Sequence, residues 1–407
     1  MSRIAVVAVA VAATAASGIA FQATDSSVEA LYRTRQWFAL RDSVTNQSPA
    51  LIRAAVAAAF NDPARAESLL RGIIRSQPRS EAADEAYDLI AKMEGRSGQY
   101  ARFNRTYAEW SAAFPNSSRV RAAKNDPDKF RGRPDQANAP RRRSTLHHDA
   151  GSYSVPVTIN GKTDDFLIDT GAGQSALTIG EAKKFGLTLL PGSAPSMDSS
   201  GTGFLSRTAI AREVIIGGMR FRSVSFEVIT PPAPFLDVEI GIVGLPIQLA
   251  LGSIRWLKDD IVEVGAAIPP SGSAPNLVFD TDPSRLLIAA EVLGKRVQAT
   301  LDTGATTTDL NANFADLFPD VISRDGKRGR SDITGAGGTQ TFDSFELPEL
   351  TFSIGQGRPF LRPATVTLQR MPLMGGGPCC IGNAGLDLLT QGLGFSIDFA
   401  TMTLQIQ

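Results

Sequence analysis

Two short segments of the sequence repeat one pattern, in which an acidic residue follows an apolar run. Residues 166–172 read Phe-Leu-Ile-Asp-Thr-Gly-Ala, and residues 299–305 read Ala-Thr-Leu-Asp-Thr-Gly-Ala. Each copy places an aspartate, Asp169 or Asp302, where a β-prone run must turn, and loops held by rigid strands often carry chemistry. One Asp-Thr-Gly tripeptide is expected by chance in about one chain in ten of this length. The inference therefore depends on the repeat and not on either copy alone.

The sequence lacks the sets of side chains that serine, cysteine or zinc chemistry needs. The two histidines, His147 and His148, are neighbours and lack the partners that a catalytic or metal-binding role needs. The two cysteines, Cys379 and Cys380, are adjacent, and neighbouring cysteines rarely form a disulfide, so we expect small buried residues. The sequence thus predicts no metal and no cofactor, and it leaves two carboxyl groups as the candidate reactive groups.

Two carboxyl groups that are brought close together cannot both ionise, so they share one proton and their pKa values separate. The ionised carboxylate can then activate a water molecule between them, while the protonated group polarises a substrate carbonyl. No covalent intermediate is required. If the fold brings them together, Asp169 and Asp302 are therefore expected to support hydrolysis by water.

The strands that position both aspartates are predicted from alternating hydrophobicity. In the first copy, residues 153–159 alternate apolar and smaller side chains, and Asn160-Gly161 is a hairpin signal before the strand that reaches the aspartate. In the second copy, residues 286–292 form the first strand, residues 293–295 the turn, and residues 297–301 the second strand. Both copies therefore share the context strand, turn, strand, aspartate.

Both copies are expected to continue alike. A short helix is predicted at residues 180–185 and again at 313–317. Hairpins at residues 256–264 and 395–404 close the copies, and their alternating final strands suit a sheet edge that can pair with the other copy. A chain that duplicates a half in this way contains the two-fold symmetry that a dimer would otherwise supply, so a monomer is favoured over a dimer.

These features resemble the aspartic proteases of the pepsin and retropepsin kind, whose signature is an apolar pair, Asp-Thr-Gly, and then Ala or Ser. Such enzymes carry a second signature of two apolar residues and a glycine, found here as Ile242-Val243-Gly244 and Cys380-Ile381-Gly382. The resemblance implies an all-β bilobal aspartic protease with two retropepsin-like lobes, at residues 151–266 and 267–407. It implies an aspartic endopeptidase that acts on a peptide or protein substrate.

The resemblance also assigns supporting residues around the two aspartates. The threonines would hydrogen-bond across the lobe interface, the glycines allow close approach of backbone N–H groups, and nearby hydroxyls would support the carboxylates. These residues are Thr170, Gly171 and Ser175 in the first copy, and Thr303, Gly304 and Thr306 or Thr307 in the second. The copies differ here, because Gly173-Gln174 stand where Thr306-Thr307 stand.

Glycine-bearing polar stretches follow in each lobe, at residues 199–203 and 334–339. Glycine permits a mobile hairpin tip, and in the family such a tip is a flap that closes over the substrate. No tyrosine follows Tyr153, so the flap tyrosine typical of pepsins is absent and the resemblance is closer to retropepsins. The flap candidates are Gly201, Gly203, Gly335 and Gly337.

The N-terminal 20 residues have the pattern of a secretory signal. Arg3 precedes an apolar run at residues 4–13, and small residues up to Ala20 follow. The run is too short and too rich in alanine for a good membrane span. We therefore expect a periplasmic or secreted protein with no stable membrane span once the signal is removed.

Residues 21–124 are predicted to form an α-helical hairpin domain that precedes the lobes. Aromatic residues recur at steps of three and four between Tyr100 and Phe114, and Asp62-Pro63 is a helix-start signal. Helices that close at Pro78 and Pro115 resemble tetratricopeptide repeats, and a generic helical bundle remains an equal interpretation. Either form could bind a protein partner.

Residues 125–150 are predicted to be an extended, solvated linker, because they are rich in proline and arginine. The net charge of the chain is zero, but residues 25–143 carry 21 Lys and Arg against 14 Asp and Glu, while residues 144–407 carry 19 against 27. Nothing in this distribution indicates nucleic acid. It suggests the hypothesis that the basic linker rests in an acidic cleft as an inhibitory segment.

A second function remains open on the sequence alone. The helical repeats could be the working part, a peptide- or protein-binding module, and the protease lobes an inactive or weakly active scaffold. The two intact Asp-Thr-Gly copies favour the enzyme, because a scaffold has no reason to retain two facing carboxyl groups.

Overall fold

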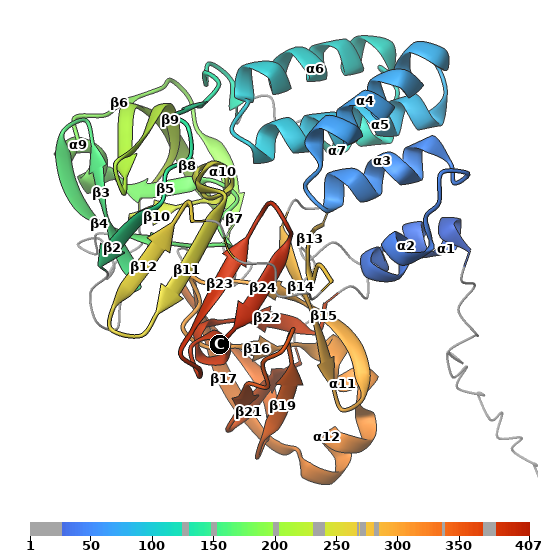
Figure 1. Ribbon diagram of the computed structural model, residues 1–407, viewed down its shortest axis with the longest axis vertical. Coiled ribbons are helices and arrows are strands. Elements are labelled where there is room, and N and C mark those ends of the chain that lie inside the picture. The colour runs from blue at the N-terminus through green and yellow to red at the C-terminus, as the bar shows by residue number, and fades with distance from the viewer. Residues whose placement is uncertain are drawn as a thin grey trace, which may run out of the picture.

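In the part of the chain that the computed structural model describes, the first third is helical, and the rest forms three β-sheets with a few short helices (Figure 1). It describes residues 27–123, 130–147, 153–197, 203–230, 241–266, 268, 274–280, 285–335, 338–368 and 380–407. The predicted signal lies outside these residues.

The first third of the chain forms the helical region, residues 27–123. Its helices are α1 (Val28–Arg33), α2 (Trp37–Ser43), α3 (Ala50–Ala59), α4 (Pro63–Ser76), α5 (Glu81–Arg96), α6 (Tyr100–Ala113) and α7 (Ser118–Ala122). The predicted start of α4 is confirmed, because the Asp62 side chain accepts from the Arg65 backbone N–H and Pro63 is the first helical residue. Tyr100, Phe103 and Trp110 are buried along one face of α6, as the spacing predicts. Among the described residues, no helix is long and apolar enough to cross a membrane.

The first β-region is a nine-stranded sheet ordered β1-β9-β5-β10-β4-β3-β8-β6, with β7 paired to β8. Its strands are β1 (Ala137–Asn138), β3 (Ser154–Ile159), β4 (Lys162–Ile168), β5 (Ser175–Thr178), β6 (Thr188–Leu189), β7 (Ala194–Met197), β8 (Gly203–Ile216), β9 (Met219–Ile229) and β10 (Ile242–Val243). Two helices belong to it, α9 (Ile179–Lys184) and α10 (Leu245–Leu251).

The second β-region is a ten-stranded sheet ordered β17-β18-β21-β16-β22-β15-β14-β19-β20, with β13 paired to β14. Its strands are β13 (Leu277–Phe279), β14 (Leu286–Val292), β15 (Lys295–Leu301), β16 (Asp309–Leu310), β17 (Lys327–Gly335), β18 (Gly338–Leu347), β19 (Leu350–Ser353), β20 (Phe360–Leu361), β21 (Ala364–Thr367) and β22 (Gly382–Ala384). Its helices are α11 (Ala312–Leu317), α12 (Pro319–Asp325) and α13 (Leu386–Leu389).

Both hairpins predicted before the aspartates are confirmed. β3 pairs with β4 and β14 with β15, each in an antiparallel ladder. The turns use left-handed backbone, with φ of 49° at Asn160 and 86° at Gly161 in the first and 51° at Leu293 and 76° at Gly294 in the second. A tight turn of this kind fixes the strand register, so each second strand ends at its aspartate.

A third, five-stranded sheet joins the two β-regions in the order β2-β12-β11-β23-β24. It contains β2 (Ser144–His147), β11 (Ser253–Leu257), β12 (Ile261–Val264), β23 (Gly394–Asp398) and β24 (Thr403–Ile406). The two closing hairpins pair with each other through their first strands, β11 and β23, which are antiparallel neighbours. The prediction that the final strands, β12 and β24, form the pairing edge was wrong. The Trp256 and Phe395 rings stack across that pair with centroids 4.4 Å apart. One continuous sheet therefore connects segments more than a hundred residues apart.

Residues 130–147, within the segment predicted as a solvated linker, are extended but packed against the β-regions. β1 pairs with β9 and β2 with β12. Arg133 is only 3% exposed, Arg141 donates to the Leu249 and Ala250 carbonyls, and Arg143 pairs with Glu263 at 2.7 Å. These arginines therefore contact the first β-region, where Arg133 reaches Gln174 and Thr208, and the joining sheet.

Cys380 is buried, as the sequence predicts. It is disulfide-bonded, however, so the expectation of a plain thiol was wrong. Sequence spacing argues against such a bond only statistically, and local backbone geometry decides it.

Candidate active site

The two Asp-Thr-Gly loops, residues 169–175 and 302–308, lie face to face; we call them the first and second aspartate loops. A Cβ atom placed on Gly171 would lie 2.7 Å from Cγ of Asp302, and one placed on Gly304 would lie 2.5 Å from Cγ of Asp169. No larger residue fits at either position without a shift of the opposite loop. Each glycine thus allows the neighbouring loop's carboxyl group to approach.

A reciprocal set of hydrogen bonds joins the loops. The Thr170 backbone N–H donates to Oγ1 of Thr303 at 3.0 Å, and the Thr303 N–H donates to Oγ1 of Thr170 at 3.0 Å. Each hydroxyl in turn donates to a strand carbonyl of the other region, Leu301 at 2.8 Å and Ile168 at 2.6 Å. Both threonines are 1% exposed. The arrangement fixes the register between the loops and leaves no buried partner unsatisfied.

Backbone N–H groups bind both carboxyl groups. Gly171 donates to Oδ1 of Asp169 at 2.7 Å, and Gly304 donates to Oδ1 of Asp302 at 2.9 Å. Asp302 accepts two more hydrogen bonds, from the Ala305 N–H at 3.1 Å and from Nδ2 of Asn383 to Oδ2 at 2.8 Å. The amide of Asn383 thus distinguishes the second carboxyl group from the first.

The electrostatics of the pair favour one proton on Asp169. Burial of its carboxyl group among protein atoms raises the pKa of Asp169 well above its ordinary value, and the charge of Asp302 and a hydrogen bond with it raise it further. Hydrogen bonds from Gly171 and Ala172 oppose that shift. The three donors at Asp302 stabilise a negative charge there. The pair can therefore hold a protonated and an ionised carboxyl group side by side.

The loops are supported from behind by equivalent bonds. Ser175 Oγ accepts from the Gly244 N–H at 3.1 Å, and Thr308 Oγ1 accepts from the Gly385 N–H at 2.9 Å. Both hydroxyl residues are buried. Thr306, the sequence-based candidate, has an exposed side chain and lies two residues before this position. Thr308 is therefore the counterpart of Ser175.

The expected position of the second signature in the second copy was wrong by three residues. β10 runs parallel to β4 with Val243 beside Ile168, and β22 runs parallel to β15 with Ala384 beside Leu301. Gly244 therefore corresponds to Gly385, and not to Gly382. Sequence inspection favoured Cys380-Ile381-Gly382 because it is more apolar, whereas Asn383-Ala384-Gly385 has the required register.

Two further side chains hold the first loop and were not found by sequence reasoning. Gln248 of α10 is fully buried, and its Nε2 donates to the carbonyls of Asp169 and Val243, both at 2.7 Å. Gln174 lies in the loop itself and accepts from Tyr100 of the helical region at 2.6 Å. A glutamine carries no motif, so only its surroundings reveal its role.

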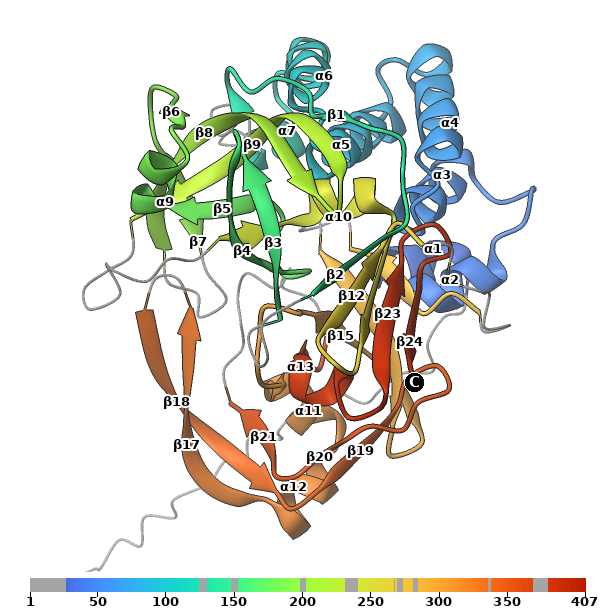
Figure 2. The same cartoon turned by 60° about the vertical axis from the view of Figure 1, so that its left-hand side comes forward.

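The flap candidates lie at hairpin ends where they are described. Gly203 begins β8 opposite Met197 of β7, and Gly335 ends β17 opposite Gly338 of β18. Figure 2 shows the Gly335 end of the β17–β18 hairpin directed towards the first β-region. Gly201 and Gly337 lie outside the described residues.

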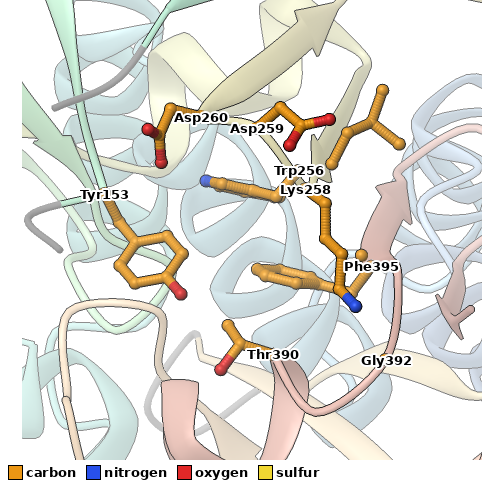
Figure 3. Close-up of a pocket in the computed structure, with 10 residues that line it drawn as sticks. Tyr153, Trp256, Lys258, Asp259, Asp260, Thr390, Gly392 and Phe395 are labelled. Atoms are coloured by element: carbon orange, nitrogen blue, oxygen red, sulfur yellow. The ribbon is translucent and has the colours of Figure 1, made fainter. Parts of the chain in front are cut away.

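A pocket of about 220 Å³ lies elsewhere, at the end of the joining sheet. Figure 3 shows Tyr153, Trp256 and Phe395 among its lining residues, and Asp259 and Asp260 at its rim. Neither aspartate loop contributes to it. Among the described residues, no three His, Cys, Asp or Glu side chains form a group that could hold a metal ion.

Comparison with known proteins points to one class. Residues 155–253, which include the first aspartate loop, match the family model for aspartyl protease. A retropepsin-like aspartic protease from Rickettsia conorii aligns with 32% of this chain and 91% of its own, at 18% identity and a TM-score of 0.23. A search of curated proteins found no match. The family match supports an aspartic protease, which is a hydrolase.

Proposed function

We propose that this chain is an aspartic endopeptidase in which Asp169 and Asp302, one from each of two lobes, act together on one water molecule. The observation that carries the proposal is the mutual approach of the two loops, in which each glycine borders the opposite carboxyl group. The raised pKa of Asp169 agrees with a pair that shares a proton. A peptide or protein is the expected substrate, and no cofactor is needed.

In the proposed reaction, ionised Asp302 removes a proton from the water molecule as its oxygen bonds to the peptide carbonyl carbon. Protonated Asp169 gives its proton to the carbonyl oxygen, so the product of this step is a neutral tetrahedral diol. The proton held by Asp302 then passes to the peptide nitrogen. As the C–N bond breaks, one diol hydroxyl returns its proton to Asp169. The pair ends in its starting protonation state, and no covalent bond to the protein forms.

The remaining parts of the chain take subordinate roles in this proposal. Thr170, Gly171, Thr303 and Gly304 fix the approach of the two carboxyl groups, while Ser175 and Thr308 hold the loops from behind. The glycine-bearing hairpin ends at Gly203 and Gly335 would close over the substrate. The helical region would bind a protein partner in a tetratricopeptide-like manner.

We further infer export to the periplasm or beyond, from the N-terminal pattern of residues 1–20. N-terminal sequencing of the protein purified after expression with its full leader tests this. A new terminus after Gly18 or Ala20 in the exported fraction is the expected result. A retained Met1 in the cytosolic fraction would contradict it.

Single substitutions of the two aspartates test the enzymatic proposal. Asp169→Asn and Asp302→Asn should each reduce cleavage of a denatured protein substrate by about 10⁴-fold, the scale on which catalytic groups act. Asp165→Asn is the matched control, because Asp165 is exposed on the same strand, β4. Circular dichroism and thermal melting establish that the variants are folded.

The same measurement separates the two candidate functions. If both asparagine variants keep the cleavage rate of the control, the carboxyl pair is not catalytic. If the wild-type chain cleaves nothing between acid and neutral pH yet its helical region captures peptides, the binding-module interpretation holds instead.

A further inference from the structure

The two aspartate loops differ most at their fifth position after the aspartate. Gln174 occupies it in the first loop and is 8% exposed, whereas Thr307 occupies it in the second and is exposed. The backbone at both positions passes directly beside a glycine: a Cβ placed on Gly244 would lie 2.3 Å from the Gln174 carbonyl carbon, and one on Gly385 would lie 2.6 Å from the Thr307 oxygen. The backbones are thus equivalent, and only the side chains differ.

The side chain of Gln174 is bound by two residues from outside the first β-region. Its Oε1 accepts from the hydroxyl of Tyr100 at 2.6 Å and from Nη1 of Arg133 at 3.1 Å. Its Nε2 donates to the Gly173 carbonyl at 3.0 Å, within the loop. Because arginine can only donate, the orientation of the Gln174 amide is determined.

Tyr100 and Arg133 are themselves immobilised. They are 1% and 3% exposed. The Tyr100 ring stacks on Phe130 with centroids 5.0 Å apart, and the Arg133 guanidinium lies 5.5 Å from the centre of the Tyr100 ring and 5.3 Å from that of Phe130. Nη2 of Arg133 also donates to Thr208 of β8 at 2.6 Å. Both groups that hold Gln174 therefore have few alternative positions.

Burial also fixes the protonation state of the tyrosine. Desolvation raises the pKa of Tyr100 to about 12, so its hydroxyl keeps its proton and remains a donor at any pH at which the protein would act. Ionisation of Tyr100 therefore does not interrupt its hydrogen bond to Gln174.

A second connection reaches the same loop through α10. Gln136 is 8% exposed, and its Nε2 donates to the Pro246 carbonyl at 3.2 Å. Gln248, two residues further along that helix, donates to the Asp169 carbonyl. Asp135 binds the N–H groups of Ala101 and Arg102 at the start of α6, which ties this segment to the helical region. Among the described residues, no helical-region side chain hydrogen-bonds to the second aspartate loop.

We propose that Tyr100 and Arg133 are positioning residues of the active site, which hold the first aspartate loop through Gln174 and so place Asp169 against Asp302. The helical region is then part of the catalytic unit, and its removal lowers activity. This is opposite to the effect expected of an inhibitory segment. The inference rests on the proposed endopeptidase function.

Tyr100→Phe tests the inference, with Tyr107→Phe as the matched control. Tyr107 lies on the same helix, but its hydroxyl donates to the Val120 carbonyl at 3.3 Å, within the helical region. Loss of one buried hydrogen bond to the loop should lower kcat about five- to tenfold, while KM stays within about twofold because substrate contacts are untouched. The control should leave both unchanged.

Two further readouts separate positioning from general stability. Hydrogen–deuterium exchange in residues 166–178 should be faster in Tyr100→Phe than in Tyr107→Phe, because the loop loses an anchor. The alkaline limb of the pH–activity profile should move to lower pH, since a looser loop weakens the interaction of the two carboxyl groups. A variant that is merely less stable would show neither change below its melting temperature.

A double-substitution cycle shows whether the effect passes through Gln174. Gln174→Met removes the amide at similar volume, and Tyr100→Phe added to it should cause no further loss of kcat. Additive losses, or a Tyr100→Phe protein that matches the control in kcat, pH profile and exchange, would overturn the inference. If instead Asp302→Asn retains wild-type cleavage, the proposed function itself is wrong and the inference is overturned with it.

Discussion

The first aspartate loop (169–175) and the second (302–308) make the same hydrogen bonds close to the aspartates but differ in their surroundings. In both, a threonine reaches the opposite loop, a glycine borders the opposite carboxyl group, and a hydroxyl holds a glycine N–H from behind. Beyond these shared contacts, Gln174 and Gln248 anchor the first loop. Thr307 and Leu389 occupy the equivalent positions of the second region. Asn383 binds the second carboxyl group, where the first has Ile242.

This difference separates two kinds of contact in a paired site. The contacts that set the distance between the two carboxyl groups must be reciprocal, because each loop packs directly against the other. Two close carboxyl groups share one proton even in a symmetric site, and a one-sided contact such as that of Asn383 biases which group holds it. The two halves of a single chain can differ in sequence and so make such a contact, whereas identical subunits of a dimer cannot.

Removal of either interloop hydroxyl should lower the free energy of unfolding more than the other substitutions considered below. The loss should be equal for the two loops. Thr303→Val leaves the buried Thr170 N–H and Ile168 carbonyl unpaired, and Thr170→Val does the same to Thr303 and Leu301. Each change should lower the free energy of unfolding by about 2 to 4 kcal/mol. Denaturant unfolding measures it. A clear inequality between the two variants would break the symmetric part of the comparison.

Asn383→Ile copies the first region's residue into the second and should reduce activity about tenfold. The isoleucine cannot donate to Oδ2 of Asp302, so the ionised form loses a stabilising bond. The loss should appear in kcat. Ile242→Val, at the equivalent strand position, is the control. Unchanged activity of Asn383→Ile would show that the Asn383 amide does not support the second carboxyl group.

Loss of the supporting hydroxyls should have a moderate effect. Ser175→Ala and Thr308→Val each leave a buried glycine N–H without its acceptor and should lower the free energy of unfolding by about 1 to 2 kcal/mol. Thr306→Val, on an exposed side chain, should change it by less than about 0.5 kcal/mol. Thermal and denaturant unfolding of the three variants decide whether Thr308 or Thr306 supports the second loop.

The smallest effect is expected at Asp309, the counterpart of Ala176 in the first region. Burial, and then repulsion from Asp387, raises the pKa of Asp309 to about 6 from 3.8. The folded state therefore holds this proton more tightly than the unfolded chain, and stability falls as pH rises between these two values. Asp309→Asn should raise the melting temperature by a few degrees above about pH 6 and leave it unchanged below about pH 4. A pH-independent difference would exclude ionisation as the cause.

Local signals in the sequence predicted the hairpins that carry the aspartates and one helix start. The turn at Asn160-Gly161 and the alternating strands around it need only residue type and spacing, and the same holds for the proline-started helix α4. These features depend on interactions within a few residues.

The contacts that distinguish the two loops depend on pairings between distant segments. The counterpart of Gly244 was misplaced at Gly382, because an apolar tripeptide is visible in sequence whereas strand register is not. Tyr100 was predicted only as one member of an apolar stripe on α6, yet its hydroxyl binds Gln174, 74 residues away. A pattern along one helix cannot show which segment that helix will face.

The sequence alone determined that two aspartates end two similar hairpins, because turn chemistry and strand alternation act over a few neighbouring residues. Tertiary structure decided which groups surround each aspartate, since the side chains of Asn383, Gln174 and Gln248 acquire their partners only when strands and helices pack in one register. The charge state of a carboxyl group depends on those neighbours and on burial, which no local pattern specifies.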